Sequence, residues 1–127
     1  MVSLGHVNIR TALLEESVAF YRDVIGLAPR RAATRPQSPD HVWMSDSLGN
    51  PCIHLQRIEA AAADGDESAG VHHIAFNCSN PDSWRSKLTS LGIEYTEAVF
   101  AEAEMLQFNL TDPNGVRLEL LFGGGGL

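Results

Sequence analysis

The chain contains 127 residues, 44% of them hydrophobic and 20% charged, which suits one globular domain and is too short for two independent ones. Its net charge of −7 argues against nucleic acid as a partner, because phosphate backbones are bound by clustered Lys and Arg. No apolar run reaches the roughly 18 residues of a membrane helix, and the N-terminus lacks the features of a signal peptide. We therefore expect a cytoplasmic domain over residues 1–127 that makes no membrane contact.

Hydrophobic periodicity and turn residues predict two copies of a βαβββ pattern along the chain. The expected strands cover residues 4–10, 28–35, 40–46, 52–58, 71–77, 93–99, 104–111 and 116–122, and the expected helices cover 14–25 and 81–91. An Asn-Pro pair at 80–81 is typical of a helix start, and Asp-Pro-Asn-Gly at 112–115 is typical of a turn. Cys52 and Cys78 fall inside strands, where a thiol usually behaves as a small buried hydrophobe, so we expect no disulfide.

The two halves of the chain repeat each other in their polar residues as well as in their pattern. A glycine ends the predicted helix 20 residues after His6 and 19 residues after His73. His6 and His54 are 48 residues apart, and His73 and Glu119 are 46 residues apart. The chain is therefore expected to contain module 1 at about 1–58, a small and acidic linker at 59–70, module 2 at about 71–122 and a Gly-rich tail at 123–127.

Strand alternation assigns the polar side chains of both halves to one face of each sheet, because successive strand residues point to opposite sides. In the first strand they alternate with Val7 and Ile9, and such apolar positions are expected to pack on the helices. His72 is one residue out of register and is expected on the apolar side, while His41, at a strand start, is expected in solvent. The polar face is predicted to carry His6, Asn8, Arg10, His54, Gln56, His73, Asn77, Arg117 and Glu119.

Four of these residues predict a metal site, because His6, His54, His73 and Glu119 occupy two pairs of matched positions. Partly burying three imidazoles and a carboxylate is costly unless they share a partner, and one divalent ion would serve all four. Imidazole and carboxylate ligands together suit Zn, Fe, Ni, Co or Mn. Each histidine taken alone also fits an ordinary surface position, and the joint pattern is what favours a site.

The chain carries four segments that together resemble one superfamily: His6–Ile9, Ser17–Leu27, Val71–Phe76 and Asp112–Leu120. They resemble the vicinal oxygen chelate superfamily, which includes glyoxalases, extradiol dioxygenases, methylmalonyl-CoA epimerases, fosfomycin-modifying transferases and bleomycin-binding proteins. The resemblance implies an α+β, glyoxalase-like fold in which two βαβββ modules form a cupped, barrel-like mixed sheet around one divalent metal. It also implies a homodimer, often with exchanged modules, that acts on a small molecule.

The resemblance supplies roles for single residues and also shows departures. His6, His54, His73 and Glu119 match the family's ligand positions. Relatives of the glyoxalase type usually carry a carboxylate where this chain has His54, which leaves Glu119 as the one carboxylate able to act as a base. Arg10 matches a position that binds the glutathione carboxylate, but Ile58 stands where the accompanying asparagine is expected, so glutathione recognition is not carried over to this chain.

The predicted metal site and the resemblance are compatible with three functions, and a fold alone does not choose among them. The leading hypothesis is a metal-dependent lyase or isomerase of glyoxalase type, in which the metal holds two adjacent substrate oxygens, Glu119 removes a carbon-bound proton, and the remaining polar residues orient the substrate. The second is a non-haem Fe(II) extradiol-type dioxygenase, against which a fourth protein ligand at His54 would count. The third is a binding protein of the bleomycin-resistance type. The predicted substrate contacts are Arg10, Asn8, Gln56 and Asn77.

Overall fold

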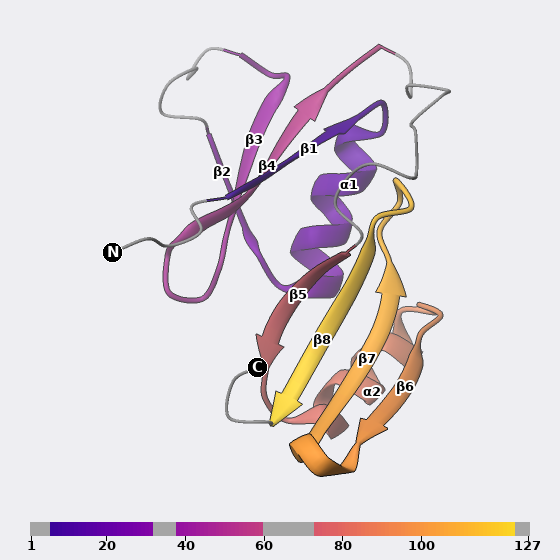
Figure 1. Ribbon diagram of the computed structural model, residues 1–127. Coiled ribbons are helices and arrows are strands. Elements are labelled where there is room, and N and C mark those ends of the chain that lie inside the picture. Colours follow the sequence, from indigo (N-terminus) through magenta and orange to yellow (C-terminus); the bar gives the residue numbers. More distant parts are fainter. Residues whose placement is uncertain (1–5, 32–37, 60–72, 124–127) are drawn as a thin grey trace. The chain divides into compact units, whose positions relative to one another are not determined.

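The computed structural model describes residues 6–31, 38–59 and 73–123 and forms two compact units, Met1–Gly65 and Asp66–Leu127 (Figure 1). Each unit contains one four-stranded mixed sheet with its helix, which confirms the predicted α+β class built from two βαβββ modules. The predicted linker, apart from Glu59, and the predicted tail, apart from Gly123, lie outside the described residues, and so does His72.

The first unit builds one sheet from four strands in the order β1-β4-β3-β2, with β1 parallel to β4 and the other neighbours antiparallel. Its elements are β1 (Val7–Thr11), α1 (Leu14–Phe20), a π-helical turn η1 (Tyr21–Ile25), β2 (Ala28–Arg31), β3 (His41–Ser45) and β4 (Pro51–Arg57). Buried side chains from the helical segment and from the middle of the sheet form its core, among them Leu14, Tyr21, Met44, Ile53 and Leu55.

The second unit repeats this plan with the strand order β5-β8-β7-β6, in which β5 is parallel to β8. Its elements are β5 (His73–Cys78), α2 (Pro81–Ser90), β6 (Thr96–Phe100), a 3-10 turn η2 (Ala101–Ala103), β7 (Met105–Thr111) and β8 (Arg117–Gly123). Leu88 of α2 is fully buried, as are Phe108 and Leu120 of the sheet. Arg85 reaches from α2 to Glu97 of β6, with nitrogen–oxygen distances of 2.9 and 2.8 Å.

The first helix differs from the prediction of one continuous α-helix over 14–25, because its last turn widens into a π-helix at Tyr21. The amide groups of Gly26 and Leu27 both donate to the Tyr21 carbonyl, at 3.0 and 2.8 Å. Gly26 adopts a φ of 94°, which a residue without Cβ tolerates and which ends the helix. The second helix begins as predicted, since the Asn80 side chain accepts a hydrogen bond from the Ser83 amide at 3.4 Å.

The hairpins that lead into β4 and β8 are closed by the same pattern of hydrogen bonds to an aspartate. In the first, Asp46 Oδ1 accepts the amides two and four residues later at 3.0 and 2.9 Å; in the second, Asp112 Oδ1 accepts the equivalent amides at 2.8 Å each. The third residue after each aspartate is a glycine with positive φ, 85° at Gly49 and 82° at Gly115. These turns fix the register of the two strands that carry His54 and Glu119.

Burial follows the predicted alternation in both units, so each sheet has one face toward its helix and one open face. Along β1 the buried residues are Ile9 and Thr11, while Asn8 and Arg10 are exposed; along β8 Leu118 and Leu120 are buried on either side of Glu119. In the part of the chain that the structure describes, no helix is long and apolar enough to cross a membrane.

Candidate metal and substrate site

The predicted ligands occupy equivalent positions in the registers of the two sheets. In the first unit Asn8 pairs with His54 across β1 and β4, and in the second Ala75 pairs with Glu119 across β5 and β8. His6 precedes Asn8 by two residues, as His73 precedes Ala75, so each histidine lies on the open face one step from the strand pair that carries the second ligand. Each unit therefore brings two of the four predicted residues together.

In the second unit His73 and Glu119 approach each other directly, with 3.6 Å between His73 Nε2 and Glu119 Oε2. The Glu119 side chain is 18% exposed and that of His73 is 41% exposed, so solvent reaches both side chains. A carboxylate at the centre of an otherwise apolar strand is held there by the buried leucines on either side, which face the helix. The strand thus presents one carboxylate to the open face.

In the first unit His6 and His54 both contact Trp43. The His54 ring is stacked on Trp43 with 4.5 Å between centroids and 9° between planes, and His6 meets the Trp43 ring edge-on at 4.4 Å. The centroids of His6 and His54 are 6.1 Å apart. Trp43 opposes His54 directly in the β3–β4 pair, so the stack follows from the register.

His41 is the residue of this face that sequence analysis placed incorrectly. It was expected in solvent, but it is only partly exposed, and its Nδ1 lies 2.8 Å from His54 Nε2, a hydrogen-bond distance. The strand alternation predicted for 40–46 places His41 and Trp43 on one face, and that signal was available. The diagonal approach of His41 to His54 depends on the cross-strand register, in which His41 pairs with Gln56.

The four predicted substrate contacts all lie on open faces, three in the first unit and one in the second. Asn8 donates from Nδ2 to the backbone carbonyl of His54 at 3.0 Å, so part of its amide already joins β1 to β4. Arg10 is exposed, makes no ion pair with any described residue, and lies in the same cross-strand row as Gln56. Asn77 is exposed on β5. The predicted contacts remain candidates on the faces where they were expected.

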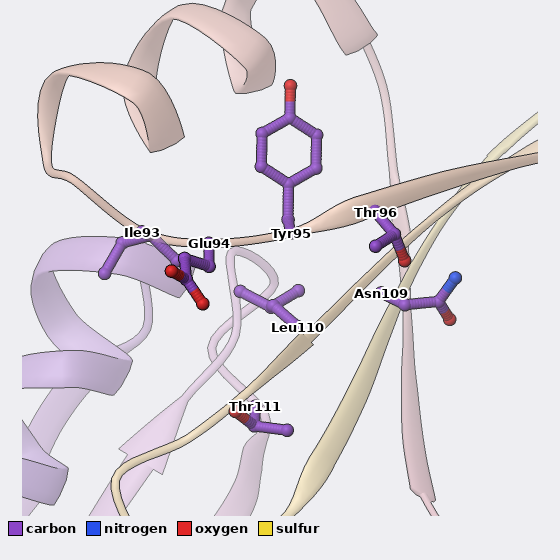
Figure 2. Close-up of a pocket in the computed structure, with 7 residues that line it drawn as sticks. All are labelled: Ile93, Glu94, Tyr95, Thr96, Asn109, Leu110 and Thr111. Atoms are coloured by element: carbon purple, nitrogen blue, oxygen red, sulfur yellow. The ribbon is translucent and has the colours of Figure 1, made fainter.

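Two amides on β7 are further candidates that sequence analysis did not name. Asn109 opposes Glu119 in the β7–β8 pair, and Gln107 donates to Asn109 Oδ1 at 2.7 Å. Asn109 also lines a pocket of about 580 Å³ together with Thr96, its partner on β6. Figure 2 shows these two side chains beside each other at the strand edge. The remaining lining residues are Ile93, Glu94, Tyr95, Leu110 and Thr111.

In the second unit the spacing of His73 and Glu119 would allow both to bind one divalent ion. In the first unit only one of the two histidines, His6, has no hydrogen bond to another described histidine. Two bonds of about 2.1 Å to one ion hold their donor atoms at most about 4.2 Å apart, and the 3.6 Å between His73 and Glu119 lies within that limit. His6 and His54 supply two further imidazoles, but Nε2 of His54 is engaged by His41. Among residues 6–31, 38–59 and 73–123 no three His, Cys, Asp or Glu side chains cluster closely enough to hold an ion. The four predicted ligands therefore lie as two pairs, one in each unit.

Comparison with known proteins gives a match to one family over most of the chain. The model of the Glyoxalase/Bleomycin resistance protein/Dioxygenase superfamily matches residues 3–120. The sequence is 27% identical to Glyoxylase I 4 of Arabidopsis thaliana over 125 residues, which is 94% of this chain and 70% of the relative.

Solved structures share the fold. A glyoxalase family protein from Bacillus anthracis aligns with a TM-score of 0.75 and 22% identity, covering 97% of this chain and 96% of its own. Lactoylglutathione lyase from Agrobacterium tumefaciens aligns with a TM-score of 0.68 and 20% identity, covering 98% and 97%. At these identities the two structures establish the fold, which is the glyoxalase-like fold predicted from the sequence, and not the reaction.

Proposed function

The chain belongs to the Glyoxalase/Bleomycin resistance protein/Dioxygenase superfamily, and on that premise we propose that it is a metal-dependent lyase or isomerase of glyoxalase type. Its substrate is a small molecule that chelates the ion through two adjacent oxygens. The observation that carries the proposal is the approach of His73 to Glu119, an imidazole and a half-buried carboxylate at 3.6 Å on the open face of the second sheet. The similarity to a plant glyoxylase and to a bacterial lactoylglutathione lyase supports the reaction class.

His73 and Glu119 would hold the ion from the second unit, and His6 would join them from the first, with His54 as the predicted fourth ligand. Zn, Ni, Fe, Co and Mn all suit such a mixture of imidazole and carboxylate. When bound, the ion would withdraw electron density from two adjacent substrate oxygens and so acidify the neighbouring C–H group. A bidentate substrate needs two open positions, which either three or four protein ligands leave on an octahedral ion.

Glu119 would act as the base that removes the acidified proton. Its side chain is 18% exposed, and the buried Leu118 and Leu120 on either side of it face the helix, so the carboxylate is on the open face of the sheet. A general base must come within hydrogen-bond reach of the carbon-bound proton in the substrate complex. Arg10, Asn8 and Gln56 from the first unit, and Asn77 from the second, would orient the substrate by hydrogen bonds and charge.

The first experiment is elemental analysis of protein purified without added metal or chelator, followed by a proton-exchange assay. One transition metal per chain, removed by a chelator together with exchange activity, is the expected result. Exchange is followed by ¹H NMR in D₂O on a panel of 2-hydroxy carbonyl compounds and the methylglyoxal–glutathione hemithioacetal. Loss of the C–H signal shows that the base has removed the proton, and this readout does not require the product to be known. A wild type that holds no metal and takes up no Zn, Ni, Mn or Fe(II) would refute the proposal and favour a binding protein.

One observation favours a second function, the Fe(II)-dependent dioxygenase. Activation of O₂ beside a chelating substrate needs three open positions on an octahedral ion, and a fourth ligand at His54 counted against it. Because His54 Nε2 is hydrogen-bonded to His41, that objection is weakened. Activity on a catechol that disappears under anaerobic conditions and returns with air, in the Fe(II)-loaded protein, would establish this function in place of the first.

We further propose that the protein is a cytoplasmic homodimer in which the two ligand pairs of one site come from different chains. Mixing His6→Ala with His73→Ala chains then restores a metal site, because one of the two sites in the mixed dimer retains both wild-type pairs. Light scattering gives the oligomeric state, and metal titration of the refolded mixture gives the restored site. A monomer in solution would refute the dimer, and a dimer whose mixtures stay metal-free would refute the exchange.

A further inference from the structure

The sheet of the second unit is interrupted where the chain enters β6. The β6–β7 register pairs Thr96 with Asn109, and continued by two residues it would pair Glu94 with Thr111. Residues 93–95 form no strand, so the pairing stops at Thr96. The interruption leaves the pocket of about 580 Å³ described above, a notch between this segment and the end of β7. Its volume is within the usual range of small-molecule pockets.

The backbone of Thr111 faces this notch. The Asp112 amide donates to the Val116 carbonyl at 2.9 Å, so the N–H and C=O groups of Asp112 point toward β8. Successive residues of an antiparallel strand direct these groups to opposite sides, which turns those of Thr111 away from β8 and toward the notch. In the described part of the chain no strand stands opposite Thr111 on that side. Thr111 therefore offers the notch one donor and one acceptor, spaced as in a β-ladder.

The side chains at the notch supply an apolar floor and one negative charge. Leu110 is buried and Ile93 is half-buried, and both line the notch. Figure 2 shows the Tyr95 ring pointing away from Leu110, so the ring does not fill the space. Glu94 is exposed and forms no ion pair with another described residue. Residues 73–123 carry seven acidic and three basic side chains, so the surroundings favour a cation over an anion.

We propose that this notch binds an α-amino amide, the group at the amino end of a peptide. The ligand's carbonyl accepts from the Thr111 amide and its ammonium donates to the Thr111 carbonyl, which reproduces the ladder pair that Glu94 does not make. The Glu94 carboxylate offsets the ammonium charge, and an apolar side chain of the ligand packs on Leu110. The site uses none of the four predicted metal ligands and is independent of the proposed lyase or isomerase.

The test is a titration of the ¹⁵N-labelled chain with L-leucinamide, followed by NMR. Excess chelator is present, because an α-amino amide can also bind a metal ion, and the pH is below the ordinary α-amino pKa of about 7.7–8.0, so that the ammonium is charged. A Kd of about 10 mM or lower is expected for a ligand of this size. Exchange of the Thr111 amide with water should slow by the factor 1 + [L]/Kd, because only the unliganded form exchanges. Exchange of the Leu110 amide, which points toward β8, should not change.

A matched probe and two matched variants isolate the contact with Glu94. The compound 4-methylpentanamide keeps the amide and the isobutyl group of leucinamide but lacks the ammonium, and it should bind about fivefold more weakly. Glu94→Gln should weaken leucinamide binding by about the same factor and leave the binding of 4-methylpentanamide unchanged. Glu102→Gln is the control, because this exposed carboxylate belongs to the same unit but lies outside the notch, and both Kd values should stay as in wild type.

Saturable binding that protects the Thr111 amide and depends on Glu94 supports the site. Absence of saturation with leucinamide refutes it, as does saturation that leaves water exchange at Thr111 unchanged. Equal losses in Glu94→Gln and Glu102→Gln would show attraction to the negative charge of the whole unit and would also refute the site. Because no metal is present in the titration, none of these results bears on the proposed metal-dependent function.

Discussion

The two units use one backbone plan and place different chemistry on it. The parallel strand pair, the aspartate hairpin and the last strand, which carries a predicted ligand, recur with the same register. His54 of the first unit and Glu119 of the second stand at equivalent positions, yet His54 contacts an indole and an imidazole while Glu119 faces the amide-bearing strand β7. The first unit surrounds its polar residue with ring contacts and a hydrogen bond, and the second leaves its carboxylate partly exposed.

A repeat in the sequence therefore predicts the position of a residue more securely than its role. Equivalent register guarantees that His54 and Glu119 reach the same face of their sheets. What each side chain can do there depends on its cross-strand neighbours, which are Trp43 for the first and Asn109 for the second. The sequence therefore predicts a matched set of four ligands, while the cross-strand neighbours place His54 against two aromatic rings and Glu119 opposite an amide.

The largest effect is expected from Glu119→Gln, which removes the proposed base and keeps the side chain's size. Proton exchange on the reactive substrate should fall about 10²- to 10⁴-fold, the usual contribution of general base catalysis. Metal content is measured in the same samples, so that loss of the ion is not mistaken for loss of the base. Glu97→Gln is the matched control, because that carboxylate lies on β6 of the same sheet and pairs with Arg85. Full exchange activity in metal-loaded Glu119→Gln would reject the assignment.

The second effect is stabilisation by the metal itself. An ion that binds only the folded protein should raise the free energy of unfolding by about 2.7 kcal/mol at a concentration 100 times its Kd. His73→Ala is expected to abolish this increase. Asn77→Ala, on the same strand and the same face, is expected to keep it, since an exposed amide is not among the proposed ligands. Chemical denaturation with and without Zn²⁺ measures both, and an unchanged increase in His73→Ala would exclude His73 as a ligand.

The third effect compares the two hairpins. Asp112 is 5% exposed and accepts two partly buried backbone amides, so Asp112→Ala removes their acceptor and should cost about 2 kcal/mol of folding stability. Asp46→Ala removes the same bonds from a more exposed turn, where water replaces them, and a smaller loss is expected. Urea denaturation compares the two variants. Equal losses would show that burial does not distinguish the two turns.

The hairpin that contains Asp46 makes the stability of the protein depend on pH, and the direction of this dependence can be predicted. Hydrogen bonds from the Asn50 and Leu48 amides hold the pKa of Asp46 below its ordinary value of 3.8. A carboxyl whose pKa is lower in the folded state stabilises the protein above the unfolded pKa, and this contribution is lost as the pH falls through the folded pKa. Asp46→Asn should therefore weaken the dependence of stability on pH below about pH 4. An acid-unfolding curve identical to that of wild type would contradict this.

Much of the fold followed from the sequence because it depends on local patterns. Alternation located all eight strands, and the Asn-Pro and Asp-Pro-Asn-Gly signals located the second helix and the last turn. The π-helical turn at Tyr21 and the position of His41 did not follow. Both depend on tertiary geometry: the turn on how the chain leaves the helix at Gly26, and the histidine on a diagonal contact between strands. The alternation of β7 already placed Gln107 and Asn109 on one face, but only the pairing of Asn109 with Glu119 makes them candidates for the site.

The smallest effect concerns the two thiols, Cys52 on β4 and Cys78 on β5, which are both partly buried. Burial raises the pKa of Cys78 to about 11, and burial followed by the nearby Asp46 carboxylate raises the pKa of Cys52. Both thiols are free and donate to backbone carbonyls of their own units. Because the thiolate is the reactive form, both should react slowly with a disulfide reagent at pH 8 and rapidly after unfolding.

The raised pKa of Cys78 also predicts how stability depends on pH. A thiol whose pKa is raised by folding contributes stability that is lost as the pH rises above its unfolded pKa. Cys78→Ala should therefore reduce the loss of stability above about pH 9. Rapid reaction of native Cys78 would show that the strand bearing it opens more readily than its burial in the second unit implies.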